Sequence, residues 1–191
     1  MMKLRLLISI LLLSILLPSC NPNKTAAGRM DRAEEAINTA PEQALASLDS
    51  IRRTTLITAP RRARYALLKA MALDKCCIDT TDINLIMPAV RYYTRKGSPD
   101  EKMRTYLYLG RIHQNAFQND SAMVSYLRAA SYSERAVDLH YKGILMSSIS
   151  DVYRMGYNYA RALEYEEMAY SCFSAVGDTT NVWYALPHLA S

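Results

Sequence analysis

The chain has 191 residues, of which 50% are hydrophobic and 21% are charged, and its formal net charge is +5 at pH 7. This length is enough for one domain with a sizeable core. The excess of positive charge is too small to indicate a nucleic-acid-binding protein, so we expect no nucleic-acid partner.

The N-terminal segment, residues 1–19, has the layout of a secretory signal. Lys3 and Arg5 precede an almost unbroken apolar run over residues 6–17. A membrane-spanning helix needs about 20 apolar residues, so this run is better suited to a cleaved signal than to an anchor. Cleavage leaves 21 basic and 18 acidic side chains, a net charge of +3.

The end of this signal, Leu17-Pro18-Ser19-Cys20, resembles the bacterial lipobox. In a lipobox a small residue precedes a cysteine that is lipidated on sulfur and becomes the new N-terminus. The resemblance implies a signal peptide over residues 1–19, acyl chains such as palmitate on Cys20, and a tether over residues 20–28. Each buried methylene of such a chain contributes about 0.8 kcal/mol to membrane binding. The alternative is an ordinary signal peptide cut after Ser19.

No acidic run follows the cysteine, which favours a lipid-anchored protein of the cell envelope that faces the periplasm, with the choice of inner or outer membrane left open. The basic cluster Arg61-Arg62-x-Arg64 is expected to be a solvated helix start. A membrane-facing patch near the anchor is the alternative and would add only a modest attraction.

The rest of the chain predicts an all-α fold. Apolar residues recur at three- and four-residue steps, and no Asn-Gly or Asp-Gly hairpin lies between alternating apolar runs. Breaks are expected near 40–41, 59–60, 79–82, 97–100, 118–120, Gly143, 156–158 and 177–178. They divide residues 29–191 into helix pairs: 29–38 with 41–53, 61–75 with 83–96, 100–117 with 121–139, and 142–155 with 158–176. A last helix over 180–191 begins a fifth unit.

These helix pairs repeat at a 40-residue interval. A shift of 40 places Ala122 on Ala162 and Ala129 on Ala169. One unit contains Tyr106, Leu109, Gly110, His113, Ala122, Tyr126 and Ala129. The next contains Met146, Ile149, Ser150, Tyr153, Ala162, Glu166 and Ala169. The second unit departs from the first at Glu166, where an aromatic residue is expected, and the neighbouring Tyr165 is the alternative occupant.

This spacing resembles the tetratricopeptide repeat (TPR), in which a bulky residue, Leu-Gly, a tyrosine, two alanines and an aromatic residue recur at fixed offsets. Here His113 stands in place of the tyrosine, and the 40-residue unit is longer than the common form. The resemblance implies an α-solenoid of antiparallel helix hairpins that form a right-handed superhelix with a concave binding face. The small residues are explained by close helix contact, which must offset about 1 kcal/mol of lost helix propensity at Gly110.

Other segments resemble a group of TPR lipoproteins of gut-type bacteria. They are the runs 63–68, 74–75, 78–79, 89–93 and 108–111. Members of that group are longer and continue into a transmembrane helix and an intracellular coiled segment. The fifth unit here lacks its second helix, which is consistent with a truncated gene product. Leu186 and Leu189 would then favour self-association through the unpaired C-terminal helix.

A stripe of four side chains is the predicted partner-binding surface. Arg104, Tyr108, Arg111 and Asn115 recur at steps of four, three and four on the face opposite Leu109 and Gly110. We expect this stripe to be exposed on the concave side and to bind a peptide, or to be a plain solvated face. The corresponding residues of the next unit are Ser147, Ser148, Asp151 and Arg154.

Catalytic and metal-binding patterns are absent from the sequence, so we expect a protein that is not an enzyme and has no cofactor or metal. His113, His140 and His188 are scattered, and no phosphate-binding loop or nucleophile motif occurs. Cys76, Cys77 and Cys172 are expected to be buried thiols, with a disulfide from Cys172 to one of the pair left open.

Two functions remain open at this stage. The first is a lipid-anchored TPR scaffold that binds a protein or peptide on its concave face, either alone or as the sensing part of a longer envelope regulator. The alternative is a binding lipoprotein of a nutrient-uptake system that binds glycans. Those proteins are much longer and carry additional inserted segments that this chain lacks.

Overall fold

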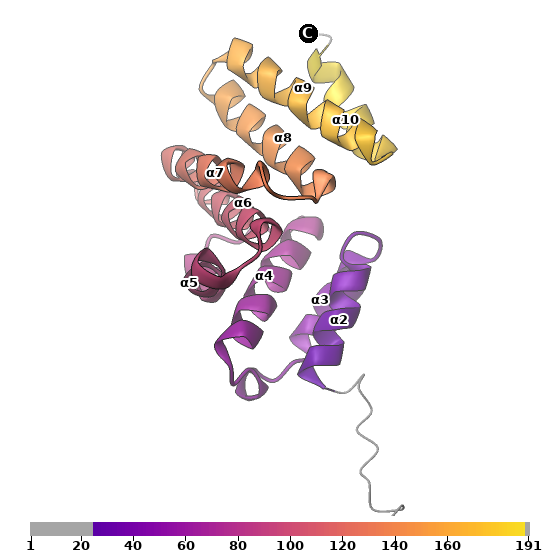
Figure 1. The fold of residues 1–191 in the computed structure, drawn as a ribbon, viewed down its shortest axis with the longest axis vertical. Coiled ribbons are helices and arrows are strands. Elements are labelled where there is room, and N and C mark those ends of the chain that lie inside the picture. The colour runs from indigo at the N-terminus through magenta and orange to yellow at the C-terminus, as the bar shows by residue number, and fades with distance from the viewer. Residues whose placement is uncertain (1–24, 190–191) are drawn as a thin grey trace, which may run out of the picture.

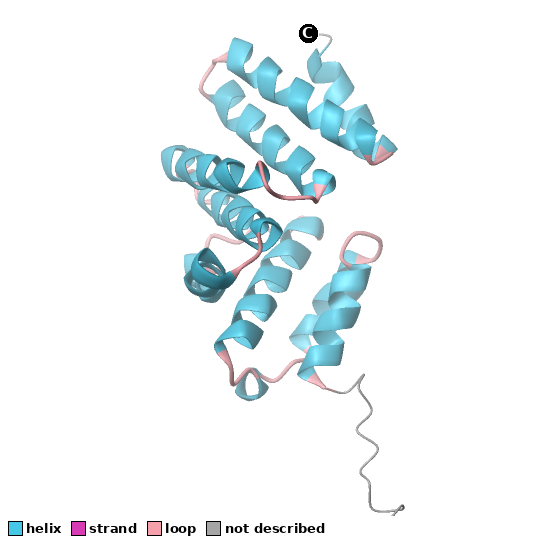
Figure 2. Cartoon of the chain, viewed as in Figure 1, coloured by secondary structure: helices cyan, strands magenta, loops and turns pink. Residues whose placement is uncertain are grey.

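The computed structural model describes residues 25–189, and side chains over residues 25–185. In this range the chain forms nine α-helices and two short 3-10 helices and contains no strand, so the all-α prediction is confirmed (Figures 1 and 2). None of these helices is both long and apolar enough to cross a membrane. The predicted signal peptide, the lipidation site Cys20 and the side chains of Leu186 and Leu189 lie outside the described residues.

The helices follow one another from the N-terminal to the C-terminal end of the described chain. They are α2 (Ala26–Ala36), α3 (Pro41–Asp49), α4 (Ala59–Lys75), α5 (Met87–Lys96), α6 (Pro99–Asn115), α7 (Asn119–Ser133), α8 (Leu139–Met155), α9 (Tyr159–Ala175) and α10 (Thr179–Leu189). The 3-10 helices are η2 (Arg53–Thr55) and η3 (Ile83–Leu85).

The 40-residue interval is visible in the helix starts. The helices α4, α6, α8 and α10 begin at residues 59, 99, 139 and 179, and α7 and α9 begin at 119 and 159. Each start therefore lies one full interval after its equivalent in the preceding unit.

The turns that follow α4, α6 and α8 repeat at the same interval. Cys77, Phe117 and Tyr157 have φ values of 55°, 57° and 58°, in the left-handed region that non-glycine residues seldom adopt. In each turn the next amide N–H donates to the carbonyl five residues earlier, as from Gln118 to His113 at 2.9 Å. This is the helix-ending Schellman bond, which satisfies a carbonyl that the helix itself leaves free. After α9 the left-handed position is held by Gly177.

Capping side chains fix several helix starts. Ser98 accepts a hydrogen bond from the backbone N–H of Glu101, and the Glu101 carboxylate accepts one from the Ser98 N–H at 2.7 Å. This reciprocal pair is a capping box. Asp138 caps α8 by accepting from the Tyr141 N–H.

The chain folds by packing each helix on the next. The most extensive contacts are those of α6 with α7 and of α8 with α9, and smaller ones join α2 to α4, α4 to α6 and α6 to α8. The second set places the first helix of each hairpin beside the first helix of the next. We refer to the surface where these first helices meet as the inner face.

Gly110 lies where α6 and α7 approach closely. A Cβ atom added at Gly110 would lie 2.2 Å from the ring of Tyr126, which is fully buried. The repeat-packing residues Ala122, Ala129, Ala162 and Ala169 are also buried, whereas Leu109 and Tyr153 are half-buried. The ring of Tyr126 thus packs directly on the backbone of α6.

Several predicted boundaries are wrong, and the helix predicted over 41–53, for example, ends at Asp49. The break predicted near Gly143 is absent, because this glycine lies inside α8, where an added Cβ would meet the ring of Phe173 at 2.6 Å. The actual break follows Ser133, so α7 ends six residues before the predicted end at Leu139. The helix predicted from Ile83 begins at Met87, after the 3-10 turn η3.

Candidate functional site

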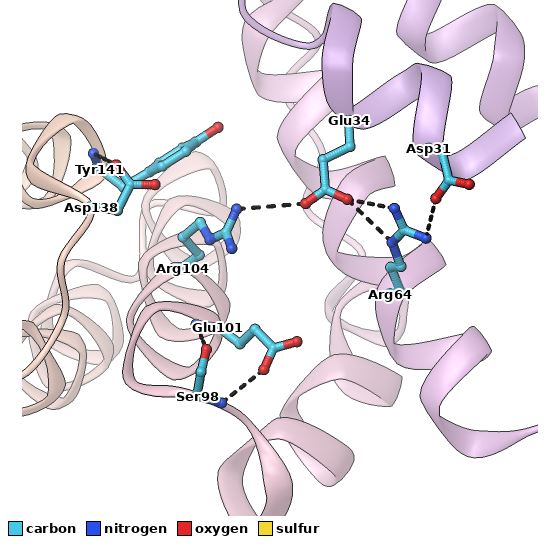
Figure 3. Close-up of polar contacts among 8 residues, drawn as sticks. All are labelled: Asp31, Glu34, Arg64, Ser98, Glu101, Arg104, Asp138 and Tyr141. Carbon is cyan, nitrogen blue, oxygen red and sulfur yellow. Dashed lines mark hydrogen bonds and ion pairs between the residues drawn. The ribbon is translucent and has the colours of Figure 1, made fainter. Parts of the chain in front are cut away.

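Charged side chains connect the first helices of the hairpins across the inner face. Arg64 on α4 donates to Asp31 at 2.7 Å and to Glu34 at 2.6 Å, both on α2 (Figure 3). These groups are a third or more exposed, and such surface pairs contribute only about 0.2–1 kcal/mol each. Arg64, the last residue of the predicted basic cluster, therefore binds α2 and is not part of a free basic patch.

Arg104 on α6 extends this row of contacts toward α8. A guanidinium nitrogen lies 4.0 Å from a Glu34 carboxylate oxygen, and the guanidinium carbon lies 5.4 Å from the centre of the Tyr141 ring (Figure 3). Burial raises the pKa of Tyr141 to about 12, so its hydroxyl is neutral at physiological pH. One arginine thus contacts both α2 and α8.

The predicted exposure of Tyr108 is wrong. Its side chain is only 1% exposed, and its ring meets that of Tyr141 edge-on at a centroid distance of 6.4 Å. Burial raises the pKa of Tyr108 well above its ordinary value of 10.0. The stripe faces the neighbouring first helices, and their approach removes Tyr108 from solvent.

Arg111 and Asn115, from the same stripe, are half-buried and contact α4 and the loop that follows it. The Arg111 Nε atom lies 3.7 Å from Asp74, and the Asn115 amide donates to the Thr80 carbonyl at 3.3 Å. Burial disfavours the charged form of Arg111, but Asp74 together with smaller effects of Tyr126, Tyr108 and Asp151 outweighs burial and raises the pKa of Arg111. The hollow beside them has a volume of about 10 Å³, the size of one water molecule. This part of the inner face has no room for a peptide side chain.

The second predicted stripe, on α8, lies partly beside an open hollow. Ser148 is buried and donates to the Ile144 carbonyl at 2.7 Å. Asp151 and Arg154 are half-buried and form an ion pair with each other. The hollow has a volume of about 180 Å³ and is lined by Ser147, Asp151, Glu166, Phe173, Asn181, Tyr184 and Ala185. The structure therefore places Asp151, but not Arg104 or Tyr108, beside a space that a ligand group can enter.

Glu166 occupies the position in α9 that Tyr126 occupies in α7. Its side chain is 4% exposed and accepts one hydrogen bond, from the Ser147 hydroxyl at 3.3 Å. The alternative occupant, Tyr165, is half-buried and stacks on Tyr153 at a centroid distance of 5.6 Å. The departure from the repeat at Glu166 thus puts a carboxylate, and not a rotated aromatic ring, between the two helices.

A second hollow, with a volume of about 450 Å³, also borders Glu166. It is lined by Ser150, Arg154, Tyr159, Ala160, Ala162, Leu163 and Glu166. Ser150 donates to the Ala162 carbonyl at 2.8 Å. Glu166 therefore borders two hollows of the α8/α9 hairpin.

Histidine and cysteine side chains have structural contacts. His113 Nδ1 lies 2.8 Å from the Gln118 side-chain oxygen, and His140 Nδ1 lies 2.9 Å from Asp178. The thiols of Cys76, Cys77 and Cys172 are free. Only Cys172 is buried as expected, whereas Cys76 is half-buried and Cys77 is exposed. Across the described side chains, no three His, Cys, Asp or Glu residues gather closely enough to hold a metal ion.

The sequence reading missed Asn181 and Tyr184, which border the hollow from α10. The signal for Tyr184 was the repeat itself, because Tyr184 lies two 40-residue steps after Arg104, a residue of the predicted stripe. Comparisons with family models, curated proteins and solved structures found no match to the chain.

Proposed function

We propose that the chain is a TPR-like α-solenoid scaffold of the bacterial cell envelope, anchored by lipid on Cys20 and facing the periplasm, that binds a protein or peptide along its inner face. The observation that carries the proposal is the helix register: α4, α6, α8 and α10 begin at the same interval, at residues 59, 99, 139 and 179, and in the series α2, α4, α6 and α8 each helix contacts the next. Stacked hairpins of this kind form continuous binding surfaces in repeat proteins.

The partner-binding region of the inner face is its C-terminal part. Between α4, α6 and α8 the inner face is filled by Tyr108, Arg104, Arg111 and their partners. At its C-terminal end, α8, α9 and α10 line a hollow of about 180 Å³, and Tyr184 beside it is 72% exposed. A large exposed aromatic side chain next to a polar hollow is a common feature of binding hot spots.

Capture of partners by a soluble form of the protein tests this proposal. The bait is residues 20–191 with Cys20→Ser, which contains every described helix. A second bait also carries Tyr184→Ala and Asp151→Asn on the inner face. The control bait carries Val124→Ala and Leu127→Ala, which are 68% and 45% exposed on α7. We expect the inner-face bait to lose a bound protein that the wild-type and control baits retain. Equal capture by all three baits would contradict the proposal.

Membrane fractionation tests the anchor separately. The full-length chain is expected in the membrane fraction, because its acyl chains bury many methylene groups. The Cys20→Ser variant is expected in the soluble fraction. Membrane association of that variant at the wild-type level would contradict lipid anchoring without affecting the scaffold proposal.

A further inference from the structure

The hollow between α8, α9 and α10 has a buried carboxylate in its wall. Glu166 contributes that carboxylate, and Asp151 on α8 adds a second, half-buried one. Ser147 and Asn181 contribute polar groups, and Tyr184 contributes an exposed ring. These groups come from three helices and surround one space of about 180 Å³.

Glu166 lacks a positively charged partner. Among the described residues, no lysine, arginine or histidine forms an ion pair with it, and its single hydrogen bond, from Ser147, is long at 3.3 Å. A carboxylate that is 4% exposed has little contact with water, which is unfavourable for its negative charge unless a cation compensates. A carboxylate in this setting attracts a cation from outside the chain.

The repeat places Arg154 as a counter-ion for Glu166, but Arg154 forms its ion pair with Asp151. In the preceding unit the Tyr126 hydroxyl donates to the Gln114 side chain at 2.7 Å. The residues 40 positions later are Glu166 and Arg154, a pair of opposite charge. Arg154, however, binds Asp151, three residues earlier on its own helix. Arg154 therefore pairs with Asp151 and leaves Glu166 without a cation among the described side chains.

We propose that this hollow binds a lysine or arginine side chain of the partner. The identity of the donor rests on the proposed scaffold function, whereas cation binding by the hollow does not. Glu166 provides an ion pair, and Asn181 provides its carboxamide oxygen, because its amide nitrogen already donates to Asp178 at 2.7 Å. The exposed Tyr184 ring provides a cation–π surface. The alkyl part of a lysine or arginine side chain fits against Phe173 and Ala185.

Small cations that mimic these side chains test the hollow directly. The probes are n-butylguanidinium and n-pentylammonium, with neutral n-hexanol as the control. The protein is the unlipidated chain, residues 20–191 with Cys20→Ser, labelled with ¹⁵N for NMR. We expect saturable shifts of backbone amides near Ser147, Asp151, Glu166 and Asn181 with the two cations, and none there with hexanol.

Three variants make the test specific. Glu166→Gln is expected to weaken the binding of both cations at least tenfold. Glu167→Gln, on the exposed side of α9, is expected to leave it unchanged. Tyr184→Ala lies at an exposed position, where it does not endanger folding, and is expected to weaken binding about two- to fivefold through the lost cation–π contact.

The outcomes separate this proposal from the scaffold proposal. Shifts that are spread over the whole surface, or unchanged affinity in Glu166→Gln, would overturn the cation site. Binding that arises only after Arg154→Met would also overturn it, because Arg154 would then be the natural occupant. If the cations bind but the inner-face variants capture the same proteins as wild type, only the scaffold proposal fails. If capture depends on the inner face but neither cation binds, only the cation site fails.

Discussion

The hairpins α6/α7 and α8/α9 have the same register but different interiors. In α6/α7 the ring of Tyr126 lies on the backbone at Gly110, where an added Cβ would lie only 2.2 Å from it. In α8/α9 the two positions are Ser150 and Glu166, and Glu166 borders two hollows of about 450 and 180 Å³. The same backbone plan thus gives a filled interior in one unit and an open, acidic one in the next.

The α8/α9 hairpin keeps an aromatic ring on a glycine, but at a different place. An added Cβ at Gly143 would lie 2.6 Å from Phe173. Gly143 lies seven residues before Ser150, and Phe173 lies seven after Glu166. Seven residues are about two helical turns, so in an antiparallel pair the contact has moved along the hairpin and remains in register. This shift stabilises the hairpin and leaves the middle free for a polar group.

Among the variants that test this difference between the hairpins, replacement of Tyr126 should change the free energy of unfolding most. Tyr126→Ala removes a fully buried ring from α6/α7 and should lower the free energy of unfolding by about 3–5 kcal/mol. Urea denaturation followed by circular dichroism measures it. The control is Leu127→Ala, the next residue on the same helix, which is 45% exposed and should change stability by less than about 1 kcal/mol. Equal losses in both variants would mean that α6/α7 is not packed around the ring.

Enlargement of Gly110 tests the same contact from the other helix. Gly110→Leu forces a side chain into the space of the Tyr126 ring and should cost about 3 kcal/mol by overpacking. Gly156→Ala is the control, because its added Cβ would meet nothing closer than 3.5 Å and its φ is −85°. The melting temperature of the control should stay the same or rise slightly. An unchanged melting temperature of Gly110→Leu would contradict the close contact.

Replacement of Glu166 should have a smaller effect of opposite sign. Glu166→Leu exchanges a buried carboxylate without a cation for an apolar group of similar size, and we expect the unfolding free energy to rise by about 1–2 kcal/mol. The same urea titration measures the change. If Glu166→Leu destabilises the protein as Tyr126→Ala does, then the carboxylate is a packing element and the two hairpins are equivalent.

The features that the sequence predicted correctly are those that depend on the local spacing of residue types. The all-α class followed from apolar spacing, and the small residues at Gly110 and Ala122 follow the interval that the helix starts show. The break near Gly143 failed because a glycine inside a helix and a glycine that ends one look alike in sequence. What distinguishes them here is Phe173, which belongs to the following helix, α9, and whose ring packs on Gly143.

The predicted binding stripe failed in part for a related reason. The spacing of Arg104, Tyr108, Arg111 and Asn115 identifies one face of one helix, but it does not show how closely the neighbouring first helices approach that face. Tyr141 and Asp74, which contact the stripe, come from α8 and α4. The left-handed turn residues Cys77, Phe117 and Tyr157 share no side-chain type, so only their 40-residue interval could have identified them.

The smallest expected effect concerns the contact that holds α10 over α8/α9, a histidine–aspartate pair whose equivalents one unit earlier are two aspartates. Asp178 caps α10 by accepting from the Asn181 N–H and lies 2.9 Å from His140 on α8. Burial alone would raise the pKa of Asp178, but hydrogen bonds from Asn181 and the proximity of His140 outweigh it and lower the pKa below its ordinary value of 3.8.

A lowered folded-state pKa means that the Asp178 carboxylate stabilises the fold above about pH 4 and loses this effect as the pH falls further. Asp178→Ala should therefore lower the melting temperature by about 2–4 °C at pH 6, as expected for the loss of one cap, and by less at pH 3. Thermal melts of wild type, Asp178→Ala and the exposed control Glu167→Ala from pH 3 to 6 measure this difference, and a gap that stays constant with pH would show that the charge of Asp178 does not hold α10 in place.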